Sequence, residues 1–126
     1  MRRVFMAYVT DTVEAVAFFC RAFGGTAKNC FKRADDEDFY AHAEIDVKGE
    51  IILALSEAVC CDMAVAPGSN MDFWMTFDDE QALRTAYDVL RENADVHSPL
   101  APCDWCPAMA ALTDKFGLRW LLSVKG

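Results

Sequence analysis

Basic residues are scarce in this sequence. It has 12 Lys and Arg residues against 20 Asp and Glu residues, so the formal net charge is −8 at pH 7 and the sequence pI is near 4.6. The few basic residues are scattered along the chain. A phosphate backbone is repelled by such a protein unless a local basic patch attracts it, so we expect no nucleic-acid partner.

Long hydrophobic runs are also absent. The longest, IILALS at residues 51–56, is far shorter than the roughly 20 apolar residues of a membrane-spanning helix. The first residues, MRRVFMAYVTD, reach charged and polar side chains too early for the apolar core of a signal peptide. The sequence therefore predicts a cytoplasmic protein with no membrane partner.

Nor does the sequence contain a stretch polar enough to stay disordered. Hydrophobic residues make up 54% of the chain and charged residues 25%, which is the composition of an ordinary globular protein. A length of 126 residues suits one compact domain and leaves little room for two independent cores. We therefore expect a single domain over residues 1–126.

Cysteine, in contrast, is plentiful. An even number of cysteines suits disulfide bonds in a secreted protein, but without a secretion signal we expect reduced thiols. The cysteines are Cys20, Cys30, Cys60, Cys61, Cys103 and Cys106.

Two of the cysteines form a Cys-x-x-Cys element, PCDWCP, which suggests a zinc site or a redox pair. A structural zinc site needs four ligands, and the adjacent Cys60 and Cys61 are poorly spaced to complete one. A thioredoxin-like pair needs a helix that begins directly after the first cysteine, but Pro107 and the strand-like AMAAL follow. The sequence thus completes neither motif, and the role of Cys103 and Cys106 stays open.

The order of predicted elements is repeated along the chain. Residues 4–10 have the composition of a strand, and residues 11–25 have helical periodicity with two glycines at the end. Further strands are expected within residues 26–57. After a linker at residues 58–70, the same order follows, with a short strand near Val96.

Matched positions support a duplication. Asp11 and Asp78, which are expected to open the two helices, are about 67 positions apart, and the hairpin glycines Gly49 and Gly117 are about 68 positions apart. The sequences of the halves are otherwise dissimilar. The chain is therefore expected to contain two βαβββ units, supported by the order of elements rather than by identity.

Strand periodicity predicts a polar surface on each sheet. Along residues 39–47, polar and apolar side chains alternate, which indicates a sheet with one apolar and one polar face. A helix covering the apolar face of each unit leaves two polar to mixed faces. If these faces oppose each other, they form a cup in which a ligand binds.

Several segments resemble a known family. The helix EAVAFFCRAFGG, the strands HAEIDVKGEIILALSE, the segment WMTFDDEQA and above all LTDKFGLRWLLS are similar to the PhnB-like branch of the vicinal oxygen chelate superfamily, which contains glyoxalases, bleomycin-resistance proteins and extradiol dioxygenases. The resemblance implies an α+β fold in which two βαβββ modules form a curved mixed-sheet cup, and a homodimer. Module one is expected at about residues 1–57 and module two at residues 71–126.

The resemblance also addresses metal binding. Catalytic members of the superfamily hold a divalent metal with four side chains, and these positions correspond here to Val4, Glu44, Asp72 and Leu121. Val and Leu cannot ligate, and two carboxylates alone form a weak site for Zn, Ni or Fe. We therefore expect no cofactor and no metal; the alternative is a divalent metal held by Glu44, Asp72 and His42.

Strand parity and the resemblance predict which side chains line the cup. The carboxylates are expected to include one with a raised pKa, or to be neutralised by an arginine. The histidine is either a ligand donor or general base or a sheet residue bonded to a neighbour, and the aromatic residues offer flat apolar area. The predicted lining consists of Tyr8, His42, Glu44, Asp72, Trp74, Trp105 and Arg119.

Two tryptophans receive specific interpretations. Trp105 matches an aromatic residue that the family carries in a loop before the seventh strand, where it either covers the cavity or only anchors the loop. Trp120 falls on the opposite sheet face and is expected in the core. His97 is expected at the surface.

The predicted function is the binding of a small organic ligand by a PhnB-like protein that lacks a complete catalytic metal site. No catalytic residue is assigned, and neither the ligand nor any reaction follows from the sequence. One alternative is a metal-dependent lyase or isomerase of the glyoxalase type. Another is a resistance protein that sequesters a basic drug, which the acidic composition favours.

Overall fold

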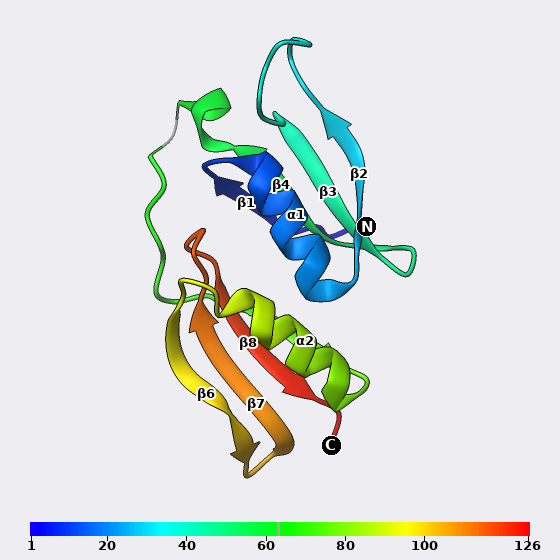
Figure 1. The fold of residues 1–126 in the computed structure, drawn as a ribbon, viewed down its shortest axis with the longest axis vertical. Helices are drawn as coiled ribbons and strands as arrows, with labels where there is room; N and C mark the ends of the chain where they lie inside the picture. The colour runs from blue at the N-terminus through cyan, green and yellow to red at the C-terminus, as the bar shows by residue number, and fades with distance from the viewer. Residues whose placement is uncertain (63) are drawn as a thin grey trace. The chain divides into compact units, whose positions relative to one another are not determined.

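A computed structural model describes residues 1–62 and 64–126. Met63, which falls in the expected linker, lies outside the described residues. The chain divides into two compact units, Met1–Val65 and Ala66–Gly126 (Figure 1).

The first unit contains one helix and a four-stranded sheet in the order β1-β4-β3-β2. Strand β1 is parallel to β4, and the other neighbours are antiparallel. A 3-10 helix, η1, follows the last strand. The elements are β1 (Met6–Val9), α1 (Thr12–Phe23), β2 (Thr26–Phe31), β3 (His42–Val47), β4 (Glu50–Glu57) and η1 (Ala58–Cys61).

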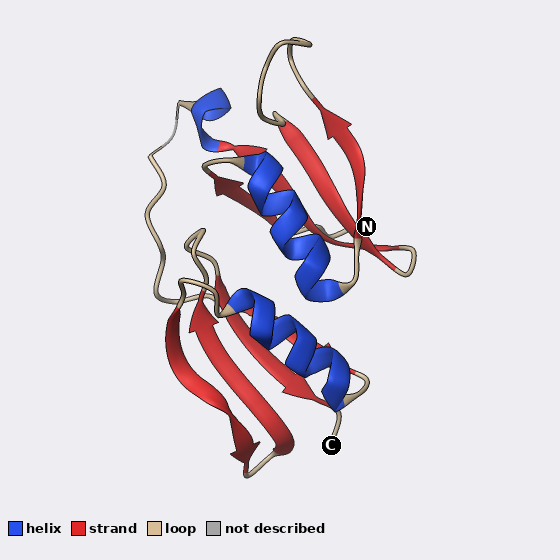
Figure 2. Cartoon of the chain, viewed as in Figure 1, coloured by secondary structure: helices blue, strands red, loops and turns tan. Residues whose placement is uncertain are grey.

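The second unit repeats this topology, with the sheet order β5-β8-β7-β6 and β5 parallel to β8. Figure 2 shows that one face of each sheet is covered by the helix of the same unit. The elements are β5 (Phe73–Phe77), α2 (Glu80–Leu90), β6 (Asp95–Cys103), β7 (Cys106–Thr113) and β8 (Arg119–Val124). The predicted α+β class and the repeated βαβββ order are therefore confirmed.

Each core lies between a helix and its sheet. In the first unit, α1 contacts β3 and β4, and Phe18, Phe19 and Ile45 on these elements are almost fully buried. In the second unit, the expected core residue Trp120 is 1% exposed and its indole N–H donates to Asp114 Oδ2 at 2.7 Å. Burial of apolar area of this kind is the main favourable term in folding.

The N-terminus of α1 is bonded to the end of the adjacent strand β4. Asp11 Oδ1 accepts the backbone N–H of Glu14 at 3.1 Å, the bond of an N-cap, while Asp11 itself has a left-handed φ of 67°. In addition, the Glu57 carboxylate at the end of β4 accepts the backbone N–H groups of Asp11 and Thr12, both at 2.9 Å. Two of the N–H groups at the start of the helix, which have no partner inside a helix, are thereby satisfied.

Helix α2 begins one residue later than predicted. Its N-cap is Asp79, whose Oδ1 accepts the N–H of Ala82 at 2.8 Å, whereas Asp78 pairs with Lys125 at 2.8 Å. Both aspartates have a side chain suited to capping, so the sequence alone does not distinguish them. With Asp79 as the cap, the two helix caps, Asp11 and Asp79, are separated by the same number of positions as Gly49 and Gly117.

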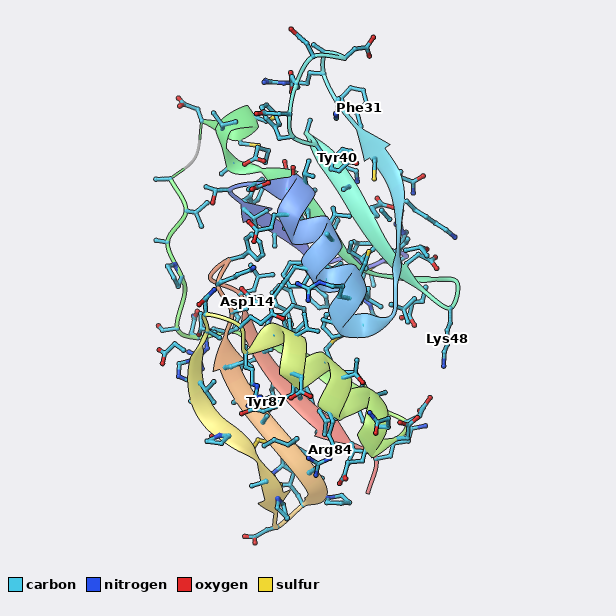
Figure 3. All side chains as sticks on the ribbon, viewed as in Figure 1. Phe31, Tyr40, Lys48, Arg84, Tyr87 and Asp114 are labelled. Atoms are coloured by element: carbon cyan, nitrogen blue, oxygen red, sulfur yellow. The ribbon has the colours of Figure 1, made fainter. Side chains whose placement is uncertain are left out.

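Two hairpin turns fall where the sequence places them. Lys48 and Gly49 both have positive φ, as a tight turn between β3 and β4 requires, and Lys48 points away from the sheet (Figure 3). In the turn between β7 and β8, Asp114 Oδ1 accepts the N–H groups of Phe116 and Leu118. The TDKFG segment is thus a turn organised by one buried aspartate.

The strand predicted near Val96 is present, but it is not short. Strand β6 runs over nine residues, from Asp95 to Cys103, and includes Pro99 and Pro102. It lies at the sheet edge and its pairing with β7 shifts register three times. Proline is tolerated at an edge because the missing N–H faces away from the ladder, so its presence did not end the strand.

The segment that the sequence predicts to be a linker also contains structure. Within the linker expected at residues 58–70, Ala58–Cys61 forms the 3-10 helix η1. Among the described residues, no helix is long and apolar enough to cross a membrane.

Candidate functional site

The first sheet brings Tyr8, His42 and Glu44 to one outer surface. Tyr8 on β1 pairs with Ser56 on β4, and Glu44 on β3 pairs with Ala54, two positions earlier on β4. Residues two positions apart on a strand point to the same side. The three residues therefore share the sheet face that α1 leaves open, as their parity predicted.

Glu44 has polar partners at both of its carboxylate oxygens. Its Oε1 accepts the Asn29 amide N–H at 2.7 Å, its Oε2 is 2.8 Å from His42 Nε2, and Arg2 lies 3.8 Å away. The hydrogen bonds from Asn29 and then His42 outweigh burial and lower the pKa of Glu44. Glu44 is therefore not the carboxylate with the raised pKa that was expected of the pair, because bonds to its charged form replace the water that burial removes.

Asn29 is a site residue that the sequence did not reveal. It has a positive φ of 52° in an irregular part of β2, where the pairing with β3 shifts between Lys28 and Phe31. Asn tolerates this left-handed conformation better than most residues, so the Asn before Cys30 was the available signal. The shift directs the amide of Asn29 to Glu44.

This arrangement is suited to binding rather than to proton transfer by Glu44. The carboxylate is held in its charged form by partners on both oxygens, so it is a fixed hydrogen-bond acceptor. The ring of His42 is about one-third exposed and uses Nε2 for Glu44. Of the two interpretations of His42, a sheet histidine bonded to a neighbour describes its observed contact.

The second sheet carries the other predicted residues. Asp72 precedes β5, and its Oδ1 accepts from Arg119 Nε on β8 at 3.0 Å. Another guanidinium N–H of Arg119 donates to the carbonyl oxygen of Ser69. Arg119 thus neutralises Asp72 and ties the segment before β5 to β8, which is the structural one of the two interpretations offered for this pair.

An aromatic pair forms the most exposed part of this surface. Trp74 is 60% exposed and Trp105 is 53% exposed, and their rings are in edge contact with centroids 5.9 Å apart. The indole N–H of Trp74 donates to Ser123 Oγ at 2.9 Å. This bond fixes the Trp74 ring, and Ser123 is a second residue that sequence parity alone did not single out.

Trp105 occupies a turn rather than a longer loop. Asp104 and Trp105 form the connection between β6 and β7, with Cys103 and Cys106 paired across it. The Trp105 ring reaches Trp74, which lies on β5 at the opposite edge of the same sheet. Whether this ring covers a ligand or only anchors the turn stays a prediction.

The four metal positions implied by the resemblance do not form an equivalent set. Leu121 on β8 pairs with Trp74 on β5. The equivalent position in the first unit is Ala54 on β4, which pairs with Met6 on β1. Glu44 instead lies on β3, one strand away. Neither Ala54 nor Leu121 has a ligating atom, so these residues do not fit the four-ligand site of catalytic relatives.

Among the described residues, no three His, Cys, Asp or Glu side chains are grouped so that they could hold a metal ion. His97, expected at the surface, is exposed and bonds Thr113 Oγ1 at 2.8 Å.

Solved structures share the whole architecture. No protein-family model and no curated protein matches the sequence. A member of the glyoxalase/bleomycin resistance protein/dioxygenase superfamily from Sphaerobacter thermophilus superimposes with a TM-score of 0.65 at 16% identity, covering 99% of this chain and 98% of its own. The chain has the glyoxalase/bleomycin resistance fold.

Two further structures are similar over nearly their full length. The PhnB protein from Bacillus cereus has a TM-score of 0.80 at 16% identity and covers 99% of this chain and 100% of its own. Protein PA1353 from Pseudomonas aeruginosa has a TM-score of 0.80 at 20% identity, with 99% and 98% covered. The resemblance found in the sequence is thus matched by the fold, and at these identities the likeness establishes the fold alone.

Proposed function

We propose that this protein binds a small, flat organic ligand and works without the four-ligand metal site of catalytic relatives. The observation that carries the proposal is the exposed aromatic pair of Trp74 and Trp105. Large exposed aromatic rings are unusual on a soluble surface unless they contact a partner. A ring already fixed by Ser123 loses little conformational freedom on binding.

The proposed role is that of a PhnB-like vicinal oxygen chelate protein. The fold supports the superfamily assignment, and the fixed acceptor Glu44 and the neutralised Asp72 support binding over acid–base chemistry. Tyr8 and His42, on the open face of the first sheet, are also part of the proposed ligand-binding lining. We further propose a homodimer located in the cytoplasm.

The binding proposal is tested with proflavine, a flat aromatic cation that suits the acidic chain. We expect saturable quenching of tryptophan fluorescence in the native protein and roughly 5- to 150-fold weaker binding by Trp74→Ala, because a stacked ring contributes about 1–3 kcal/mol. The matched control is Phe31→Ala, since Phe31 is 57% exposed on β2 of the other unit (Figure 3). Equal affinity in all three proteins would contradict the proposed surface.

The metal proposal is tested separately with Mn²⁺, which prefers oxygen ligands and avoids thiols. The protein is loaded with Mn²⁺, desalted and analysed by atomic absorption. We expect far less than one ion per chain, since the relevant positions include Val4 and Leu121. Stoichiometric retention that is lost in Glu44→Gln would favour the glyoxalase-type alternative.

A further inference from the structure

Cys103 and Cys106 face each other across the turn between β6 and β7. They are directly paired in the ladder, and their Sγ atoms are 3.3 Å apart. Directly opposite residues in antiparallel strands have Cα atoms about 4.5–5.5 Å apart, inside the range of about 4.4–6.8 Å that a disulfide spans. The backbone therefore already has the spacing of a disulfide while both thiols are free.

The turn supplies backbone hydrogen bonds to the Cys103 sulfur. The backbone N–H groups of Trp105 and Cys106 both donate to Cys103 Sγ, an arrangement that resembles the capped start of a helix. Burial opposes the effect, but these bonds and the Cys106 thiol lower the pKa of Cys103. The N–H groups of the turn thus act on Cys103 as those of a helix N-terminus would, although no helix follows Cys103 in the sequence.

The second sulfur has the opposite environment. Cys106 is 7% exposed, whereas Cys103 is half-buried. Burial raises the pKa of Cys106, the Cys103 sulfur raises it further, and the thiol donates to the Ala108 carbonyl oxygen at 3.2 Å. An accessible thiol with a lowered pKa beside a buried thiol with a raised pKa is the arrangement needed for exchange with an external disulfide.

We propose that Cys103 and Cys106 form a reversible redox pair that exchanges with low-molecular-weight disulfides of the glutathione type. The Cys103 thiolate attacks one sulfur of the disulfide R–S–S–R, forms a mixed disulfide and releases one RS⁻. Cys106 then gives up its proton and attacks the Cys103 sulfur, which releases the second RS⁻. The two cysteines are oxidised to one disulfide, the small disulfide is reduced, and the two thiol protons end on two RSH molecules.

The test uses the full-length protein and oxidised glutathione at neutral pH. After incubation, remaining thiols are blocked with N-ethylmaleimide and the cysteines are assigned by peptide mass spectrometry. We expect the number of titratable thiols to fall by two, with the loss mapped to the peptide that contains Cys103 and Cys106. Added dithiothreitol should restore both thiols.

Two variants separate the roles of the sulfurs. Cys106→Ser should trap a mixed disulfide with glutathione at Cys103, and Cys103→Ser should leave Cys106 unmodified because it is buried. The control is Cys30→Ser, which removes an exposed cysteine. The pKa of Cys30 is raised, mainly because part of the side chain is shielded from water, so this variant should leave oxidation of the pair unchanged.

If a variant does not fold, the wild-type protein alone still tests the proposal, which is overturned if Cys30 acquires glutathione while Cys103 and Cys106 stay reduced. In Cys106→Ser, the proposal is overturned if Cys30 reacts before Cys103. Binding of proflavine is a separate measurement, so the redox pair and the aromatic surface are tested independently.

Discussion

Asp114 shows how one residue explains most of a sequence signature. Its carboxylate is 4% exposed and accepts from the indole of Trp120 and from the N–H groups of Phe116 and Leu118. Burial raises the pKa of Asp114, although each of these bonds acts in the other direction. The aspartate in TDKFG is therefore needed by the turn and by the core tryptophan.

Replacing Asp114 with Asn tests this role. The amide oxygen can still accept from the two backbone N–H groups, but the amide N–H₂ then faces the indole N–H of Trp120. We expect a loss of about 1–3 kcal/mol in the free energy of unfolding, the usual penalty for an unsatisfied buried donor. Urea denaturation measures it, with Asp35→Asn, an exposed position, as the control; equal stability of both variants would contradict the role.

Glu44 predicts a specific pH dependence. Because hydrogen bonds lower its pKa in the folded state, its contribution to stability is fully present above the unfolded pKa of about 4.3 and is lost as the pH falls through the lower folded value. Urea midpoints measured between neutral and acidic pH should therefore depend less steeply on pH in Glu44→Gln.

The dependence should be reduced rather than abolished in this variant. The pKa of Asp46 is also lowered, first by the N–H of Gly49 and also by Lys28, so a second group retains an acid response. Glu50→Gln, at an exposed position on β4, should retain the full dependence. An unchanged slope in Glu44→Gln would show that its bonds to Asn29 and His42 do not persist in solution.

At the scale of elements, the start of α2 offers a matched pair of neighbours. Asp79 caps the helix, while Asp78 forms an exposed ion pair with Lys125. We expect Asp79→Ala to lower the free energy of unfolding by about 0.5–2 kcal/mol and Asp78→Ala by less, because exposed ion pairs contribute about 0–1 kcal/mol. Thermal or urea denaturation of the two variants compares them, and the reverse order would restore the sequence-based choice of Asp78.

The elements that sequence could predict are those with periodic patterns. Both helices and the β3–β4 hairpin follow from apolar spacing and glycine positions, and strand parity placed Tyr8 and Trp74 on exposed faces. The length of strand β6 was underestimated because its prolines are acceptable only at a sheet edge. Whether a strand lies at an edge is a property of the assembled sheet.

The contacts that sequence could not predict depend on irregular backbone. Asn29 reaches Glu44 through a shift in register, and Cys103 receives two N–H groups from a turn that has no helical pattern. Both rely on local geometry that periodicity does not encode. The identity of any ligand is likewise not contained in the pattern of strands.

At the scale of the whole molecule, the proposed homodimer has a clear test. Each chain carries a net charge of −8, so two copies repel each other and salt should strengthen their association. We expect sedimentation equilibrium to give twice the chain mass of 14.1 kDa, with dimer formation favoured at higher ionic strength. A monomer at every protein and salt concentration would rule the dimer out.

The bond between Glu57 and the start of α1 has a consequence for the order of folding. Glu57 lies 45 residues after Thr12, whereas the cap of α2 is the residue that directly precedes it. During synthesis, each helix has its local cap, Asp11 or Asp79, as soon as it emerges, but the N–H groups of Asp11 and Thr12 can donate to Glu57 only after β4 has left the ribosome. Contacts between distant residues form slowly because a long loop must close first, so the first half of the chain to be made is the half whose helix is completed late.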